Sequence, residues 1–165
     1  MKQLGFTLIE MVMTMIIIGV LAVFVIPNMG SIKTFEDVAY QDKVRSALQF
    51  ARASAVAQRR KVCVQLANHD LALSIDTVTP EDSATSCTVA SALPRLLAMP
   101  SPDRGCDAAN KVCHPSGVTL TATAGAISYA ISFSPLGKPS EGVTYTLTGQ
   151  TAGTITVEAE TGYVY

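Results

Sequence analysis

Two histidines, four cysteines and a glutamate at the start of an apolar run are the residues that could do chemistry in this chain. His114 follows Cys113, and Cys106 lies seven residues earlier, but a fourth zinc ligand at a suitable spacing is missing. His69 stands beside Asp70 in a predicted turn and no motif supplies a nucleophile near it, so we interpret it as a solvated turn residue. Neither histidine therefore indicates a catalytic or metal site.

Other patterns of enzymes and metal proteins are also missing from the sequence. There is no Gly-x-Ser-x-Gly elbow, no phosphate-binding loop and no pair of carboxylates at helical spacing on a predicted helix. Asp103, Asp107 and Asn110 offer oxygen atoms, but Arg104 and Cys106 interrupt them, so we interpret the stretch as a solvated polar loop rather than a calcium site. The sequence predicts a protein that is not an enzyme and holds no metal or cofactor.

Glu10 opens an apolar segment, since residues 11–26 contain no charged side chain. The segment is long enough to cross a membrane, and a charge inside hydrocarbon costs about 2.5 to 3.5 kcal/mol. Glu10 therefore needs a cationic partner. Cleavage between Gly5 and Phe6 would create one, because the new amino group of Phe6 would lie one helical turn from Glu10, and the same amine of a neighbouring copy could also serve.

The order of segments at the N-terminus is not that of an ordinary signal peptide. In a signal peptide the small-residue cleavage site follows the apolar region, which is then discarded. Here a leader of residues 1–5 with one basic side chain, Lys2, precedes the apolar run, so a cut after Gly5 would keep that run.

The sequence Gly5-Phe6-Thr7-Leu8-Ile9-Glu10, followed by about twenty apolar residues, resembles the class III signal of type IV pilins and type II secretion pseudopilins. The resemblance implies that a prepilin peptidase cleaves after Gly5 and N-methylates Phe6. It also implies that Glu10, the fifth residue of the mature chain, serves in docking between subunits.

Gly19 and Pro27 mark the weakest stretch of the N-terminal helix. Proline removes a backbone donor and clashes with the preceding turn, and glycine in a helix costs about 1 kcal/mol. The resemblance implies that this stretch loses helicity in assembled fibres. An ordinary kink where the helix leaves the membrane is the alternative.

The pattern of apolar residues after residue 30 predicts a helix followed by strands. Val44, Leu48, Ala51 and Ala55 share one face of a helix that extends to about residue 60. After that helix, apolar residues recur at every second position, as is typical of strands. This predicts a hairpin at residues 62–75 and later strands at 118–123, 127–133, 143–147 and 154–159. We therefore predict an α+β fold, in which one long helix, broken near Pro27, packs on an antiparallel sheet.

Four cysteines follow the apolar segment, and an exported chain would meet an oxidising compartment, so their even number suggests two disulfides. Of the three possible pairings we favour Cys63 with Cys87 and Cys106 with Cys113. Residues 77–116 hold five prolines and three of these cysteines, which predicts a long loop ordered by the disulfides.

Stretches that follow the apolar segment, at residues 48–55, 131–137 and 155–164, resemble the GspH/FimT-type minor (pseudo)pilins, the group of the H-type pseudopilins and the FimT/FimU-type minor pilins. The resemblance implies a leader at 1–5, a transmembrane or filament-core helix at 6–30, and a periplasmic pilin-like head at 31–165. It implies a minor pilin that primes or caps a type IV pilus; the alternatives are a minor pseudopilin of type II secretion and a DNA-binding minor pilin of a competence pilus.

The implied partners are other pilin or pseudopilin subunits, the prepilin peptidase, the inner-membrane assembly platform, and the inner membrane itself through residues 6–26. The implied location is the bacterial inner membrane in a single pass, with the head in the periplasm, and then the pilus or pseudopilus.

Charge is distributed unevenly although the net charge is −1. Residues 33–61 carry seven basic and three acidic side chains, and residues 62–165 carry four basic and nine acidic ones. Arg59, Arg60 and Lys61 form a basic run, which we interpret as cations that complement a helix C-terminus; a patch that binds acidic neighbours or DNA is the alternative. The acidic C-terminal stretch disfavours DNA.

Overall fold

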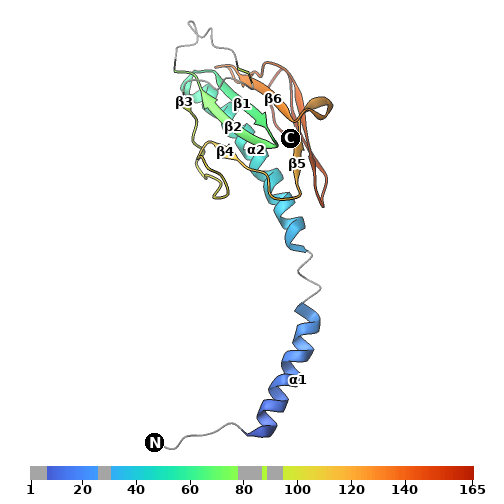
Figure 1. Ribbon diagram of the computed structural model, residues 1–165. Helices are drawn as coiled ribbons and strands as arrows, with labels where there is room; N and C mark the ends of the chain where they lie inside the picture. The colour runs from blue at the N-terminus through green and yellow to red at the C-terminus, as the bar shows by residue number, and fades with distance from the viewer. Residues whose placement is uncertain (1–6, 26–30, 78–86, 89–94) are drawn as a thin grey trace, which may run out of the picture. The chain divides into compact units, whose positions relative to one another are not determined.

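The computed structural model describes residues 7–25, 31–77, 87–88 and 95–165 (Figure 1). The chain divides into two compact units, Met1–Phe35 and Glu36–Tyr165. The second unit, the head, holds all the strands and most of the second helix.

The first helix, α1, spans Leu8–Val25 and consists almost entirely of apolar residues. Thr7 precedes it and caps it, since the backbone N–H of Glu10 points to the Thr7 carbonyl (3.1 Å) and hydroxyl (3.4 Å) oxygens. The helix continues through Gly19, while Gly5, Phe6 and Pro27 lie outside the described residues. Among the described residues, no helix combines the length and the apolarity that crossing a membrane requires.

The second helix, α2, spans Ser31–Gln58 and has one buried face. Val44, Leu48, Ala51 and Ala55 are fully buried, which confirms the face predicted from their spacing. The helix ends in a Schellman motif, because Arg59 is left-handed (φ 51°) and the Arg60 N–H donates to the Ala55 carbonyl.

The first sheet contains a hairpin and its neighbours. β1 (Val62–Ala67) and β2 (Asp70–Ile75) are joined by Asn68 and His69, both with positive φ, as a two-residue type I′ turn requires. β6 (Ser128–Phe133) pairs with the other edge of β1, and the two-residue strands β3 (Arg95–Leu96) and β4 (Lys111–Val112) pair with β2. All these pairs are antiparallel.

The second sheet has the strand order β5-β7-β8, formed by Thr119–Thr121, Val143–Thr148 and Gly153–Val157. A short 3-10 helix, Thr123–Gly125, separates β5 from β6. The C-terminus extends the sheet, because Tyr165 exchanges two backbone hydrogen bonds with Thr156, of 2.8 and 3.1 Å.

The buried faces of α2 and of both sheets contribute to one hydrophobic core. The α+β class is therefore confirmed, with the difference that the strands form two sheets rather than one. The reason is the pairing of β6, which lies along the edge of β1 opposite β2, while β5 pairs with β7. The structure pairs Cys63 with Cys87 and Cys106 with Cys113, the pairing that the sequence favoured.

The turn at Gly162 packs closely against another backbone segment of the head. Gly162 is left-handed (φ +67°), and a Cβ there would collide with the Gly137 carbonyl oxygen of the β6–β7 connection. We expect Gly162→Ala to lower the free energy of unfolding by about 2 to 4 kcal/mol, from conformational strain plus displaced backbone. Thermal and urea unfolding of the full chain in detergent measures the loss.

Gly125→Ala is the matched control, because Gly125 is also left-handed (φ +76°) but nothing lies within 4 Å of its Cβ position. This variant should cost only the conformational strain of about 1 kcal/mol. Equal losses for the two variants would show that the contact with Gly137 does not limit the packing of the turn.

Candidate assembly site

The surface of α1 is a candidate assembly site. From Leu8 to Leu21 its large apolar side chains are between 44% and 83% exposed, on every side of the helix. A helix that is apolar all round requires a nonaqueous or protein environment. Glu10 is the only charged residue of α1, and within the described residues it takes part in no ion pair. Phe6, its predicted partner, lies outside those residues.

A buried carboxylate joins α2 to the second sheet. Asp37 is 3% exposed, and its Oδ2 accepts the backbone N–H of Thr151 at 2.8 Å in the β7–β8 turn. A Cβ on Gly149 would lie 2.6 Å from the same oxygen, so the turn needs glycine there. Further along α2, Gln41 Nε2 donates to the Thr154 carbonyl (3.5 Å) and Arg52 Nε to the Thr161 carbonyl (3.0 Å). The helix is thus fixed to the sheet by polar contacts at several turns.

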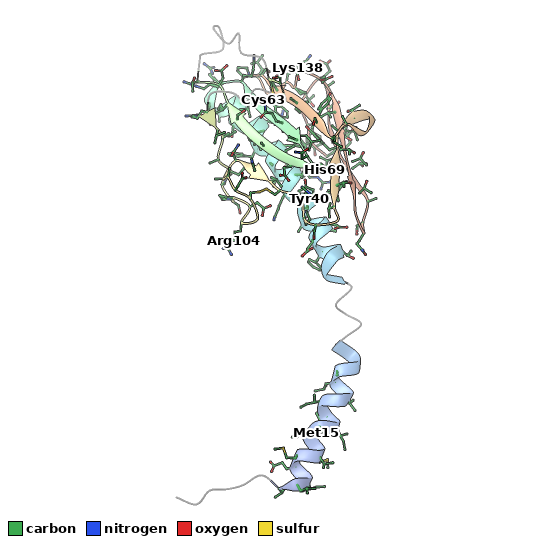
Figure 2. All side chains as sticks on the ribbon, in the orientation of Figure 1. Met15, Tyr40, Cys63, His69, Arg104 and Lys138 are labelled. Carbon is green, nitrogen blue, oxygen red and sulfur yellow. A yellow bond between two sulfur atoms is a disulfide. The ribbon has the colours of Figure 1, made fainter. Side chains whose placement is uncertain are left out.

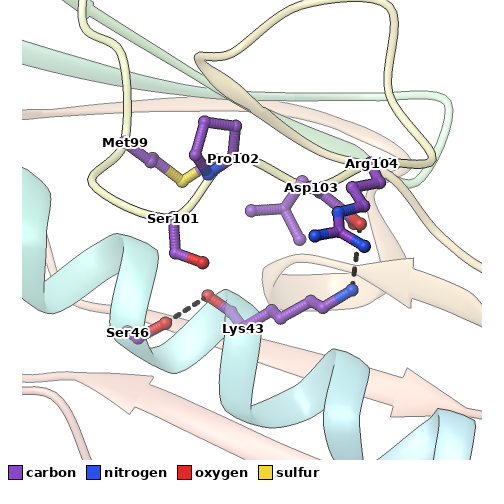
Figure 3. A pocket seen from close by; sticks show the side chains of 8 residues that line it. Lys43, Ser46, Met99, Ser101, Pro102, Asp103 and Arg104 are labelled. Atoms are coloured by element: carbon purple, nitrogen blue, oxygen red, sulfur yellow. Dashed lines mark hydrogen bonds and ion pairs between the residues drawn. The ribbon is translucent and has the colours of Figure 1, made fainter.

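A second link joins α2 to the loop that carries the Cys106–Cys113 disulfide. Lys43 Nζ lies 3.0 Å from Asp103 Oδ1, at the edge of a cleft of about 310 Å³ between the helix and the loop (Figure 3). Burial alone would raise the pKa of the Asp103 carboxyl. The hydrogen bond and charge of Lys43, with backbone hydrogen bonds from Gly105 and Cys113, outweigh burial and lower that pKa below its ordinary value.

The Lys43–Asp103 pair makes the stability of the head depend on pH. Because the pKa of Asp103 is lowered by folding, the pair stabilises the fold above the unfolded-state pKa of about 3.9 and loses this effect as the pH falls through the folded-state value. We expect Lys43→Met to lower the unfolding free energy by about 0.5 to 1 kcal/mol at neutral pH. Urea unfolding should show that the difference from the unaltered protein disappears in acid.

Lys111→Met is the control for Lys43→Met, because its partner Asp107 is fully exposed although Nζ and Oδ1 lie 2.9 Å apart. It should leave the stability unchanged at every pH. A pH-independent loss for Lys43→Met would mean that the packing of its methylenes, and not its charge, stabilises the loop.

The two histidines lie together at the end of the hairpin. His69 lies in the hairpin turn as expected, but it is partly buried rather than fully solvated, and its Nδ1 is 2.8 Å from the Leu120 carbonyl oxygen. The cause is long-range packing of β5 over the turn. The Tyr40 hydroxyl of α2 donates to the His69 carbonyl at 2.6 Å (Figure 2), and burial, with the charges of Asp70 and Asp103, raises the pKa of Tyr40.

His114 contacts the same turn, with its Nδ1 and its backbone nitrogen at 2.8 and 3.0 Å from Asp70 Oδ1. The two imidazole rings meet edge to face, with their centres 5.5 Å apart. No local sequence pattern predicts this group, since the two histidines are 45 residues apart in the chain. The cluster connects α2, the hairpin and the disulfide loop.

The residues considered for metal binding have other contacts. The sulfurs of Cys106 and Cys113 are joined to each other, Asp107 pairs with Lys111, and the buried amide of Asn110 donates to the Leu73 carbonyl at 2.9 Å. Within the described parts of the chain, no three His, Cys, Asp or Glu side chains are grouped to hold a metal ion.

The basic run at the end of α2 is engaged within the head. The Arg60 guanidinium donates to the backbone carbonyls of Asp76 and Thr77, and the Lys61 carbonyl accepts the Asp76 N–H. Arg59 is exposed beyond the helix end. These contacts give Arg60 a structural role at the switch from helix to sheet.

Comparison with known proteins adds two findings. Residues 1–26 match the model of the prokaryotic N-terminal methylation motif. No curated protein matches the chain by sequence.

The solved structures that resemble the fold include a minor pilin and a minor pseudopilin. The type IV minor pilin FimU of Pseudomonas aeruginosa matches with a TM-score of 0.51 and 15% identity, over 81% of this chain and 89% of that one. The minor pseudopilin EpsH of the type II secretion system of Vibrio cholerae matches with a TM-score of 0.53 and 12% identity, over 78% of this chain and 92% of the EpsH chain.

Proposed function

We infer that this chain, which carries the N-terminal methylation motif of pilin-like proteins and has the fold of minor pilins and pseudopilins, is a non-enzymatic subunit of a type IV pilus. The observation that carries the proposal is the motif match over residues 1–26 together with the exposed apolar surface of α1. At 12 to 15% identity the two structural likenesses support the fold, and the role of a minor subunit that primes or caps the fibre is our proposal.

In the proposed mechanism, the leader is cut after Gly5, Phe6 is methylated, and residues 6–26 hold the chain in the inner membrane until assembly. The apolar surface of α1 then exchanges lipid for the helices of neighbouring subunits. Glu10 would pair with the Phe6 amine of the adjacent subunit, and this pairing removes an uncompensated charge only in the correct register. Docking would thus be selective as well as attractive.

A minor pseudopilin of a type II secretion system is the second candidate, because EpsH resembles the fold as closely as FimU does. DNA binding has less support. Arg60 is engaged with backbone carbonyls, and the C-terminal segment carries Glu158 and Glu160, so this end of the head would repel a polyanion.

A photo-crosslinking amino acid at position 35 separates the two candidates, because the Phe35 side chain on α2 is 80% exposed. In the native cell, crosslinks to a major type IV pilin would support the pilus proposal. Crosslinks to a major pseudopilin would assign the chain to secretion instead. The same crosslinker combined with Glu10→Ala is the control, since the crosslinks should disappear when docking fails. Crosslinks to neither class would contradict a filament role.

A further inference from the structure

The outward side of the second sheet consists of threonine alone. Its inward residues, such as Leu120, Tyr145 and Ile155, are buried, and the residues that alternate with them point away from the core. All seven outward positions of β5, β7 and β8 are threonine, and we call them the threonine face: Thr119, Thr121, Thr144, Thr146, Thr148, Thr154 and Thr156.

The register arranges these side chains in rows across the strands. Thr146 is paired with Thr121 on one side and with Thr154 on the other, while Thr144 is paired with Thr156. Paired side chains in antiparallel strands are about 4.5 to 5.5 Å apart. The threonine face therefore presents closely spaced hydroxyl and methyl groups across three strands.

Two tyrosines continue the row at the C-terminal edge. Tyr165 pairs with Thr156 through the backbone, and Val164 points into the core, so Tyr163 and Tyr165 point outward. Each tyrosine is 59% exposed, and their rings are stacked with centres 6.0 Å apart and planes at 24°. Two large exposed rings held against each other are a feature that solvation of a sheet face does not require.

Charge distinguishes the threonine face from the rest of the head. Residues 62–165 have five more acidic than basic side chains, and Glu141, Glu158 and Glu160 border the sheet, yet no outward side chain of the three strands is charged. Exposed faces of soluble proteins ordinarily mix both signs of charge. The bordering glutamates would repel a polyanion. A cationic protein would have no acidic side chain to pair with on the threonine face. An uncharged polar ligand therefore fits best.

We propose that the threonine face, with Tyr163 and Tyr165, binds an uncharged polysaccharide. A threonine hydroxyl can both donate and accept hydrogen bonds, as sugar hydroxyls do, and its methyl group can contact the C–H side of a sugar ring. The hydroxyls of Thr119 and Thr121 already donate to the Thr148 and Thr146 carbonyls (3.5 and 3.4 Å), so toward a sugar these two serve as acceptors. The tyrosine rings supply apolar faces and phenolic hydroxyls at the edge of the same surface. This interaction goes beyond subunit assembly and would let the head attach to a neutral glycan.

The test is retention of the full chain on insoluble neutral polysaccharides, namely cellulose, chitin, starch and mannan, with immobilised heparin as the anionic comparison. The detergent must lack sugar headgroups, which would compete. We expect retention on at least one neutral glycan and none on heparin. Thr146→Lys, which places a hydrated cation at the centre of the threonine face, should weaken retention about tenfold, and Tyr163→Ser should weaken it as well.

Ala53→Lys is the matched control, since it adds the same charge on the exposed side of α2 and should leave retention unchanged. Unfolding curves check that each variant is folded. The proposal is overturned if no neutral polysaccharide retains the chain, or if folded Thr146→Lys and Tyr163→Ser are retained like the unaltered protein. It is equally overturned if Thr146→Lys removes the chain from fibres but leaves retention intact, because the face would then be a subunit contact.

Discussion

Replacing Glu10 with alanine is expected to remove the chain from fibres while leaving leader cleavage intact. Glu10 is the only charge of α1 and takes part in no ion pair within the described residues, so a neighbouring subunit is where its partner is expected. Losing the pair leaves the cation of the neighbour uncompensated in an apolar fibre core. This costs about 3 to 5 kcal/mol, which lowers the equilibrium constant for docking more than a hundredfold. Immunoblots of sheared fibres and of membranes measure the two pools.

Glu10→Gln separates docking from a local role of Glu10 in the helix. Thr7 and Glu10 have the spacing of a capping box, in which glutamine replaces glutamate without loss. If charge pairing drives docking, Glu10→Gln should fail as Glu10→Ala does. Thr14→Val, which removes only a hydroxyl bonded to the Met11 carbonyl of the same helix, should assemble normally. Fibres containing Glu10→Ala at the level of the unaltered protein would refute the mechanism.

Gly5→Leu is expected to abolish maturation. A peptidase that cuts between Gly5 and Phe6 must accommodate the residue before the cut, and a branched side chain there should block cleavage. The uncut chain retains the leader with Lys2, has no free amine at Phe6, and should stay in the membrane. Gel mobility and N-terminal mass spectrometry of the membrane fraction measure the ratio of uncut to mature protein.

Gly19→Leu is the control for this substitution, because nothing lies within 4 Å of a Cβ at Gly19 and the helix continues through that position. It should be cleaved normally. A mature-size band from Gly5→Leu would show that the cut lies elsewhere, and the docking role of Phe6 would then have no basis.

Local signals in the sequence predicted much of the fold. The spacing of Val44, Leu48, Ala51 and Ala55 identified the buried face of α2, and Asn68-His69-Asp70 identified the hairpin turn. Both are local effects, of helical periodicity and of turn geometry. The division of the strands into two sheets depends on which strands pair across long separations, and alternation within a strand carries no information about its partner.

Local sequence patterns do not predict the contacts that hold the head together. No local pattern indicates that Asp37 is buried, since its hydrogen-bond partner Thr151 lies 114 residues away in the chain. His69 lies in a turn, and its contact with the Leu120 carbonyl depends on where β5 packs, which the local sequence does not indicate. By contrast, Gly5, Phe6 and Glu10 belong to one contiguous motif, which can be recognised from the sequence alone.

Mass spectrometry of the N-terminal peptide in purified fibres tests the central proposal most directly. We expect sheared fibres to contain this chain, with Phe6 as its first residue carrying one methyl group on the amine and with Glu10 unmodified. The same fibres from the Glu10→Ala strain should lack the peptide. Fibres in which the chain is absent, or in which it still carries residues 1–5, would contradict the account.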